Sequence, residues 1–314
     1  MKPLLLVLIH LTDDRKALIE PVFDILYAPD AARRKSSIET EGARIRAVLT
    51  NGAVGLTAAE IAALPALEFV SAIGAGYEKI DVKAAKARGI QVTNGGGTNA
   101  ACVADHVFAL LLGTVRKVPE YDKAVRDGLF REVLPLLPNF SGKKLGILGL
   151  GEIGREVAKR AAGFDLEIAY CNRRQRADVD FQYFDNIHAL ATWSDYLIIA
   201  APGGAETFHL IDATVLQELG SKGYLVNIAR GSLVDSAALA QALHNGTIAG
   251  AGLDVYETEP APPTELLACP NLVIAPHVAG LSPEAFMAAD TRFIENARRF
   301  FAGEPVTHSV VDAA

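Results

Sequence analysis

The segment Lys143 to Arg155 constrains the fold of this chain more than any other feature. It reads Lys-Lys-Leu-Gly-Ile-Leu-Gly-Leu-Gly-Glu-Ile-Gly-Arg. The apolar run Leu145 to Leu148 predicts a short buried strand, and Gly149, Gly151 and Gly154 stand where that strand would turn into a helix. We expect the first glycine to permit the tight turn, the second to admit a pyrophosphate close to the backbone, and the third to let the helix pack on the strand.

The residues after these glycines strengthen the interpretation. An apolar helical face follows, and the apolar run Ile168 to Cys171 predicts the next strand. Together these make a complete βαβ unit that is typical of dinucleotide binding, although a glycine-rich turn in another α/β protein would have the same spacing. The phosphates are expected to meet the backbone at the start of the helix, at Leu150, Gly151, Glu152 and Ile153.

The tip of the second strand usually selects the cofactor, because an acid there binds the ribose of NADH whereas an arginine accommodates the 2′-phosphate of NADPH. Here the strand is followed by Asn172, Arg173 and Arg174, and no acid occurs before Asp178. The guanidinium groups suit a phosphate dianion, so we predict a cofactor site that includes Asn172, Arg173 and Arg174 and prefers NADPH, with NADH as the alternative. A solvated basic loop is the other interpretation.

Bulk properties exclude several classes of partner. The chain has 314 residues, of which 50% are hydrophobic, so we expect about two domains with sizeable cores. Its 30 basic and 37 acidic residues give a formal charge of −7, and the basic residues gather only in short runs. We therefore predict no nucleic-acid partner and no anionic membrane surface. No apolar stretch is long enough to span a bilayer.

The three cysteines are odd in number and far apart, and they lie in no zinc-like spacing. A disulfide framework or a metal site is therefore not expected, and reduced thiols in the cytoplasm are the simpler interpretation. The run Leu4 to Ile9 is short and is soon followed by Asp13 and Asp14, so it is interpreted as the first strand rather than a signal peptide.

Strand-like and helix-like segments alternate along the first part of the chain. Thr57 and Glu60 have the spacing of a capping box at the start of one helix. This alternation predicts an α/β domain with a doubly wound parallel sheet over residues 1 to about 98. The expected strands are Leu4 to Ile9, Phe23 to Tyr27, Ile45 to Thr50, Leu67 to Ile73 and Ile90 to Thr93.

A long helical pattern begins near Asn99 and continues, nearly uninterrupted, toward Arg126. Residues 128 to 140 are predicted to form an irregular arm, because Pro135 and Pro138 disfavour a continuing helix. The leucines of this arm would pack on a second subunit if they are exposed. Packing on their own domain is the open alternative.

Further short apolar strands predict a second doubly wound domain over residues 99 to 281. These strands are Tyr196 to Ala200, Gly223 to Ile228, Ala249 to Val255 and Leu272 to Ala275. A final amphipathic helix is expected at Pro283 to Phe301, and the tail after it is expected to return to the first domain. The first domain would then comprise residues 1–98 and 282–314.

Three of the later strands are followed by residues that are capable of chemistry. Arg230, Glu259 and His277 each come shortly after a different strand. Ligands of such sheets bind at the carboxyl ends of the strands, so an arginine, a carboxylate and an imidazole are expected to converge near the nicotinamide end of a cofactor. Singly, each could instead be a surface ion pair, a solvated acid or a structural imidazole.

At these residues the chain resembles the D-isomer-specific 2-hydroxyacid dehydrogenase family, and within it the NADPH-preferring glyoxylate/hydroxypyruvate reductases and the hydroxyphenylpyruvate reductases. The similarity covers nearly the whole chain. It implies a flavodoxin-like substrate domain, a Rossmann coenzyme domain, an active site in the cleft between them, and a homodimer. The resemblance is carried by Gly149 to Gly154, Asn227 to Asp235, Gly252 to Pro260 and Pro276-His277.

The resemblance also implies residue roles. Arg230 matches the arginine that orients the substrate, Glu259 the acid beside the catalytic histidine, and His277 that proton donor. The loop Ile73 to Tyr77 matches the family's carboxylate-binding loop, in which the amides of Ala75 and Gly76 form an anion nest. Positions that match cofactor-contacting segments are Ala201, Pro202, Thr207, Ile228, Ala229 and Asp254.

One departure from the family pattern is visible. Many members carry a histidine shortly before the proline of the loop that here reads Ala200-Ala-Pro-Gly-Gly204, and this chain has none there. We interpret the change as subfamily variation in cofactor contacts. Phosphoglycerate dehydrogenases of the family often carry a regulatory domain after the final helix, and with the last residue at Ala314 we do not expect one here.

The predicted chemistry is hydride transfer to a ketone. Negative charge develops on the carbonyl oxygen, protonated His277 supplies a proton, and Glu259 favours the imidazolium form. Arg230 holds the carboxylate of the substrate. We predict NADPH-dependent reduction of glyoxylate or hydroxypyruvate to (R)-2-hydroxy acids. The alternatives are larger 2-oxo acids, such as phenylpyruvate or 2-ketogluconate, and a non-catalytic dinucleotide sensor similar to the C-terminal-binding-protein corepressors.

Overall fold

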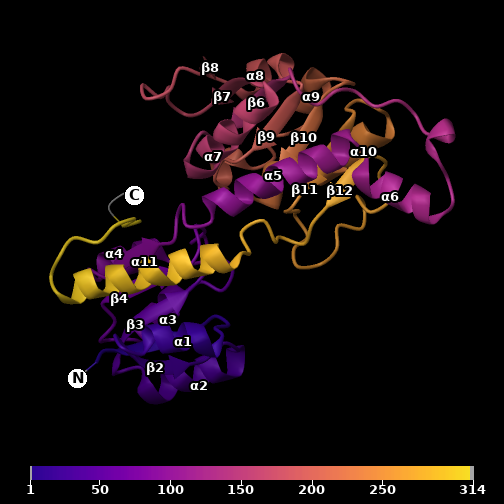
Figure 1. Cartoon of the computed structure of the whole chain (residues 1–314). Helices are drawn as coiled ribbons and strands as arrows, with labels where there is room; N and C mark the ends of the chain where they lie inside the picture. Colours follow the sequence, from indigo (N-terminus) through magenta and orange to yellow (C-terminus); the bar gives the residue numbers. More distant parts are fainter. Residues whose placement is uncertain (1, 312–314) are drawn as a thin grey trace. The chain divides into compact units, whose positions relative to one another are not determined.

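The protein is described by a computed structural model that covers residues 2–311 and contains two compact units. The first unit comprises residues up to Asn99 together with residues from Leu281 onward, and the second unit comprises Ala100–Gly280. Residue 1 and residues 312–314, which the predicted first domain includes, lie outside the described residues. Each unit is an α/β structure built on one parallel sheet (Figure 1).

The sheet of the first unit has five strands, and every neighbouring pair is parallel. Its spatial order is β2-β1-β3-β4-β5, which is the flavodoxin-like order. The predicted strands are all present: β3 has the predicted bounds, and the others are one or two residues shorter at one or both ends, except that β5 ends one residue later than predicted. They are β1 (Leu4–Val7), β2 (Asp24–Tyr27), β3 (Ile45–Thr50), β4 (Phe69–Ala72) and β5 (Gln91–Asn94).

Both faces of this sheet are buried, because alternate residues of each strand point to opposite sides. One set, which includes Leu6 and Val48, packs with the helices α2 to α4, and the other set, which includes Leu5 and Leu49, packs with α1 and α11. Thr57 and Glu60 form the expected capping box at the start of α3. The helices are α1 (Asp13–Ile19), α2 (Ala31–Glu41), α3 (Ala58–Ala62), α4 (Val82–Ala87) and α11 (Pro283–Phe301).

The last helix and the tail belong to the first unit. Helix α11 has the predicted bounds and buries Phe293 and Ala297 against the sheet. The tail then forms an antiparallel bridge between Ser309 and Thr93 of β5, and the N–H of Val310 donates to Val92 O at 3.0 Å. The chain therefore returns to the sheet that it began, as expected.

The sheet of the second unit has seven parallel strands in the order β12-β11-β10-β9-β6-β7-β8, a Rossmann arrangement extended by one strand. Strand β8 was not predicted, although Val179, Phe181 and Tyr183 alternate with polar residues as in an edge strand. The strands are β6 (Lys144–Leu148), β7 (Glu167–Cys171), β8 (Gln182–Phe184), β9 (Tyr196–Ile199), β10 (Tyr224–Asn227), β11 (Gly250–Leu253) and β12 (Leu272–Ile274).

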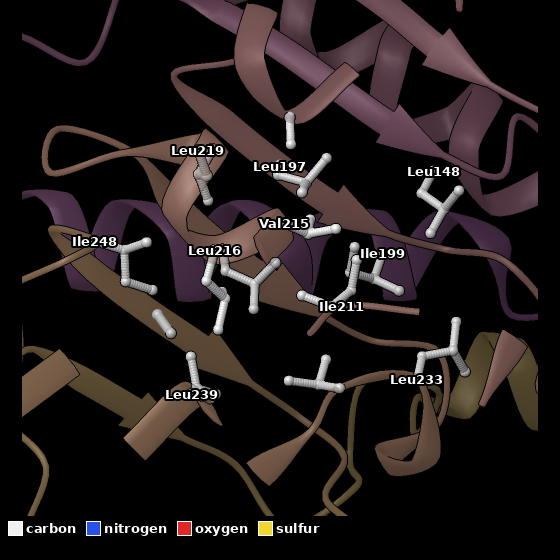
Figure 2. Close-up of a cluster of buried hydrophobic side chains, with 14 of the residues drawn as sticks. Leu148, Leu197, Ile199, Ile211, Val215, Leu216, Leu219, Leu233, Leu239 and Ile248 are labelled. Carbon is white, nitrogen blue, oxygen red and sulfur yellow. The ribbon is translucent and has the colours of Figure 1, made fainter. Parts of the chain in front are cut away.

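Helices cover both faces of this sheet as well. Helices α5 and α7 bury one face together with Ile147, Ile198 and Val226. Helices α8 to α10 bury the other face, where Leu197 and Ile199 lie among the leucines shown in Figure 2. The helices are α5 (Ala100–Val115), α6 (Val118–Arg126), α7 (Glu152–Ala161), α8 (Ile187–Trp193), α9 (Ala213–Leu219) and α10 (Ser236–His244). Short 3₁₀ turns occur at η1 (Arg131–Val133), η2 (Ala162–Phe164), η3 (Ala205–Thr207) and η4 (Gly231–Leu233).

The prediction of a nearly uninterrupted helix from Asn99 toward Arg126 was wrong. Helix α5 ends at Val115, Lys117 adopts a left-handed conformation with φ of 51°, and α6 starts at Val118. The cause is Pro119 in the first turn of α6, because proline lacks an N–H and its ring clashes with the carbonyl four residues earlier. The arm at residues 128–140 is irregular apart from η1, as predicted.

Candidate active site

The glycine turn after β6 has the backbone geometry that the sequence predicted. Gly149 has a φ of +98°, and a Cβ at this position would lie 2.6 Å from the backbone nitrogen of Ala201, so only glycine fits. A Cβ at Gly154 would collide with Gly149 O, which explains how closely α7 packs on the turn. A Cβ at Gly151 would meet no atom within 4 Å, so the backbone is open to a ligand at this residue.

The start of α7 offers hydrogen-bond donors to an anion. Gly151 is the N-cap and makes no side-chain cap, and helix geometry leaves the first-turn N–H groups of Glu152 and Ile153 without acceptors inside the helix. The N–H of Leu150 is different, because it donates to Asn172 Oδ1 at 2.7 Å. The side chain of Asn172 thus braces the glycine turn, and the amides beyond Leu150 are the ones that suit phosphates.

A groove of about 1390 Å³ lies along this turn within the second unit. It exceeds the usual size of pockets for small ligands, which is about 300–1,000 Å³, so it has room for a dinucleotide. Of the predicted cofactor residues, its lining includes Leu150, Gly151, Asn172, Arg173, Arg174, Ala201, Pro202 and Thr207. The open glycine position, the uncapped helix and the size of the groove together fit an NAD(P) molecule.

The arginines at the tip of β7 differ in their surroundings. Arg173 is 88% exposed and lies 3.9 Å from Glu206, which is equally exposed. Arg174 is also exposed. Asp178 is the first acid after the strand, and the guanidinium groups of Arg176 and Arg155 hold the pKa of its carboxyl far below the ordinary range. The negative charge of Asp178 is therefore balanced by Arg155 and Arg176, and Asp178 forms no ion pair with Arg173 or Arg174 among the described residues.

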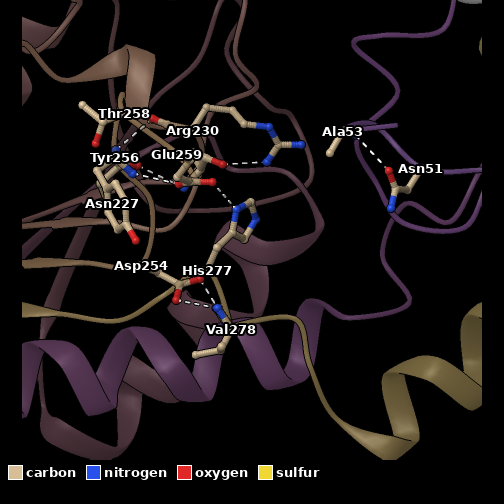
Figure 3. A network of polar contacts seen from close by, with 12 residues as sticks. Asn51, Ala53, Asn227, Arg230, Asp254, Tyr256, Thr258, Glu259, His277 and Val278 are labelled. Carbon is tan, nitrogen blue, oxygen red and sulfur yellow. Dashed lines mark hydrogen bonds and ion pairs between the residues drawn. The ribbon is translucent and has the colours of Figure 1, made fainter. Parts of the chain in front are cut away.

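Glu259 and His277 form a direct pair within the second unit (Figure 3). His277 Nδ1 lies 2.7 Å from Glu259 Oε2, and the other carboxylate oxygen accepts the N–H of Tyr256 at 2.9 Å. The His277 side chain is 50% exposed, and no group among residues 2–311 hydrogen-bonds its Nε2. One ring nitrogen is therefore held by a carboxylate while the other faces outward, as a proton donor requires.

Asp254 fixes the backbone beneath His277. Its carboxylate is 1% exposed and accepts the N–H groups of Val278 at 2.8 Å and Ala279 at 2.9 Å, while its backbone oxygen accepts the N–H of His277. His106 Nε2 lies 3.4 Å from the same carboxylate. Burial alone would raise the pKa of Asp254, but His106 and the two amides lower it below its ordinary value. The side chain predicted as a cofactor contact thus holds the histidine loop in place.

Arg230 follows β10 on a loop that a buried asparagine braces. Asn227 is fully buried, its Nδ2 donates to Arg230 O at 2.9 Å, and its Oδ1 accepts the N–H of Ala229 at 3.0 Å. Gly231 brings this loop against the next one, because a Cβ there would collide with the backbone of Tyr256 and Glu257. Ile228 and Ala229, which were predicted to line the cofactor, are buried at 6% and 8% exposure. Figure 3 shows Arg230 beside the Glu259–His277 pair.

The predicted carboxylate-binding loop follows β4 in the first unit. Asn94, at the end of β5, donates from Nδ2 to Ala75 O at 2.7 Å, and the N–H of Gly95 donates to Gly74 O at 2.8 Å. The backbone around Ala75 and Gly76 is therefore fixed by its neighbour strand. The supporting roles of Asn94 and Asn172 were not predicted, because each depends on a contact with a residue on another loop. Their position at the end of an apolar strand was the available signal. His106 lies within α5, where no local pattern indicated its contact with Asp254.

Comparisons with known proteins settle the family. Residues 108–279 match the family model for the D-isomer specific 2-hydroxyacid dehydrogenase, NAD binding domain. The chain belongs to the D-isomer-specific 2-hydroxyacid dehydrogenase family. It is an oxidoreductase of the class that acts on CH–OH donors, and its second unit carries the family's NAD(P)-binding domain.

The relatives of this dehydrogenase are similar over most of their length. Glyoxylate/hydroxypyruvate reductase A of Arabidopsis thaliana is 38% identical over 93% of this chain and 94% of its own. Hydroxyphenylpyruvate reductase of Plectranthus scutellarioides is 40% identical over 85% of this chain and 86% of its own. A similar solved structure is that of NADPH-dependent glyoxylate/hydroxypyruvate reductase from Sinorhizobium meliloti in complex with NADP and malonate. The TM-score is 0.89 and the sequence identity is 36%, and the match covers 99% of this chain and 97% of that one.

Among residues 2–311, no helix combines the length and the apolar character that crossing a bilayer requires.

Proposed function

We propose that this dehydrogenase reduces small 2-oxo acids, glyoxylate or hydroxypyruvate by first choice, to (R)-2-hydroxy acids with NADPH. The observation that carries the proposal is the Glu259–His277 pair, in which a carboxylate holds one imidazole nitrogen and leaves the other outward beside Arg230. Bound NADPH supplies the hydride. The residues of the chain then need to orient a carboxylate, transfer one proton and hold a dinucleotide.

We assign each of these roles to particular residues. His277 donates a proton from Nε2 as charge develops on the ketone oxygen, and Glu259 stabilises the imidazolium through Nδ1. Arg230 binds the substrate carboxylate with its planar guanidinium. The amides of Ala75 and Gly76 are proposed to bind the same carboxylate. The first turn of α7 is proposed to bind the pyrophosphate.

The preference for NADPH rests on charge at the tip of β7. Arg173 and Arg174 are exposed there, and the nearest acid after the strand is neutralised by Arg155 and Arg176. Arg174→Ala is expected to weaken NADPH binding far more than NADH binding, because only NADPH carries the 2′-phosphate. Fluorescence titration with both nucleotides measures this, and equal weakening would overturn the phosphate assignment.

The substrate test is a panel of 2-oxo acids, with consumption of NADPH followed by its absorbance. Glyoxylate, hydroxypyruvate, phenylpyruvate and 2-ketogluconate span the range of side chains. We expect the highest catalytic efficiency with the two small acids. The similarity to a hydroxyphenylpyruvate reductase supports phenylpyruvate-like acids as the second candidate. A higher catalytic efficiency with phenylpyruvate than with the small acids would favour that candidate. No activity with any of the acids would refute the proposal.

We also propose a homodimer formed through the arm at residues 128–140, in a reducing, cytoplasmic setting where the three cysteines stay free thiols. The arm exposes large apolar side chains, with Phe130 at 66%, Val133 at 69% and Leu136 at 100%. Such a cluster is typical of an interface with another protein. Analytical ultracentrifugation of the chain and of Leu136→Glu tests it, and a wild-type monomer would contradict it.

A further inference from the structure

A second histidine–carboxylate pair lies next to the proposed catalytic pair and has no role in it. His209 Nε2 lies 2.7 Å from Glu257 Oε1, and Glu257 is separated from Glu259 by one residue. The two pairs thus share one short loop after β11. The side chains of Glu257 and His209 are only 27% and 33% exposed, so both are largely enclosed by protein.

The carboxylate of Glu257 connects three loops that follow three neighbouring strands. Its Oε1 meets His209 from the loop after β9, and its Oε2 accepts the N–H of Ser236 at 3.1 Å, where α10 begins after the β10 loop. The same two loops also pair with each other, because the N–H of His209 donates to Ser232 O at 2.8 Å. We call this contact of His209, Glu257 and Ser236 the loop junction.

The imidazole of His209 has neighbours besides Glu257. The ring of Phe208 stacks on it with centroids 3.9 Å apart, and its Nδ1 lies 3.8 Å from Asp235 Oδ2. Its backbone is left-handed, with φ of 49°, a conformation that non-glycine residues adopt only when their surroundings stabilise it. Asp235 and Glu257 are the charged groups that face the ring. A ring fixed between two carboxylates suits a positioning role.

We propose that the loop junction is a positioning device for the proposed reductase. Glu257 anchors the loop that carries Glu259, and the backbone of Tyr256 and Glu257 abuts Gly231, next to Arg230. The loop after β9 contains Pro202 and Thr207, which are predicted to line the cofactor. The carboxylate of Glu257 therefore fixes the positions of Glu259, Arg230 and the loop after β9 relative to one another. This inference rests on the proposed function for its catalytic consequence.

The test compares turnover of glyoxylate or hydroxypyruvate in four variants. His209→Ala and Glu257→Gln are expected to lower kcat about 10- to 100-fold, because small misplacements of reacting groups have effects of that order. His209→Gln keeps an N–H donor toward Glu257 and should restore most of the turnover. The matched control is Glu218→Gln, which removes a carboxylate from another His–Glu pair, with Oε2 2.8 Å from His188 Nδ1, and should leave kcat unchanged.

Two further measurements separate positioning from loss of folding. The double variant His209→Ala/Glu257→Gln should lose no more turnover than the worse single variant, because both changes break the same contact. His209→Ala removes the contact that anchors Glu257 and should loosen the loop in which the N–H of Tyr256 donates to Glu259. Amide hydrogen exchange in segment 256–259 should therefore be faster in His209→Ala than in Glu218→Gln. Melting temperatures of all variants exclude global unfolding as the cause.

The outcomes distinguish the two proposals. A wild-type protein that is inactive on every 2-oxo acid would overturn the proposed function, and the exchange measurement would then decide the loop junction alone. An active wild type whose kcat survives His209→Ala, or an exchange rate of segment 256–259 that the substitution leaves unchanged, would overturn the loop junction. Additive losses in the double variant would also count against it.

Discussion

The two histidine–glutamate pairs after β11 have nearly identical contacts but different surroundings. In each pair a nitrogen lies 2.7 Å from a carboxylate oxygen, and in each the second oxygen accepts a backbone N–H. His209 is closed in by Asp235 and Phe208, whereas no group among residues 2–311 hydrogen-bonds Nε2 of His277. A short histidine–carboxylate contact therefore does not by itself identify a catalytic pair. The outward Nε2 of His277, with no carboxylate beside it in the described part of the chain, is the difference that supports its proposed role as proton donor.

The largest expected effect follows from that free nitrogen. His277→Ala should lower kcat about 10²- to 10⁴-fold, the usual contribution of a general acid or base. The affinity for NADPH should change little, because the predicted dinucleotide contacts lie on other residues. Steady-state kinetics and nucleotide titration measure the two quantities. Turnover equal to that of the wild type would refute the proton-donor role, and a loss no larger than that of His209→Ala would erase the difference between the pairs.

A smaller effect is expected when the carboxylate beside the imidazole of His277 loses its charge. Glu259→Gln should lower kcat by about 10²-fold, at the lower end of general acid–base contributions, because His277 remains but its imidazolium is less stabilised. The pH dependence of kcat/KM should also change, since the glutamine is neutral at every pH. An unchanged pH profile would show that Glu259 acts on the position of His277 and not on its charge.

His277 has a buried carboxylate, Asp254, beneath its loop, whereas the second carboxylate near His209, that of Asp235, is 33% exposed. Asp254→Ala should destabilise the protein, because a buried N–H that loses its acceptor costs about 1–3 kcal/mol, and Val278 and Ala279 both lose theirs. Asp212→Ala is the matched control, since Asp212 also accepts two backbone N–H groups but caps the half-exposed start of α9. Urea unfolding measures both. An equal loss in the two variants would contradict a special role of burial at Asp254.

The smallest expected effect is on the pH dependence of stability. Burial would raise the pKa of Glu257, but the hydrogen bonds from Ser236 and His209 outweigh it and lower the pKa below the ordinary value. A carboxyl with a lowered pKa in the folded state adds stability above its unfolded pKa of about 4.3, and this contribution is lost as the pH falls through the folded value. The difference in unfolding free energy between wild type and Glu257→Gln should therefore be present at neutral pH and shrink below about pH 4.3. A difference independent of pH would contradict the ionised pair.

The fold class, the residue types of the candidate site and all strands except β8 could be predicted from the sequence. Short apolar runs are typical of strands buried in a parallel sheet. The spacing of Gly149, Gly151 and Gly154 is a local pattern, and the contact between Gly154 and Gly149 is local as well, but the close approach that requires glycine at 149 is made by Ala200 and Ala201. The placement of Arg230, Glu259 and His277 after successive strands also follows from local order along the chain. The break between α5 and α6 also had a local signal, Pro119, which the prediction of one long helix did not take into account.

Which polar groups meet is fixed by the fold and not by local patterns of residues. Asn172 bonds the amide of Leu150, Asp254 holds the loop of His277, and Glu257 joins His209 to Ser236. Each of these contacts joins residues that are 21 to 48 positions apart in the chain. A carboxylate looks the same in the sequence whether it is solvated, paired or capping an amide. Its role depends on neighbours that long-range strand pairing brings within 3 Å, and no local pattern of residues encodes those distances.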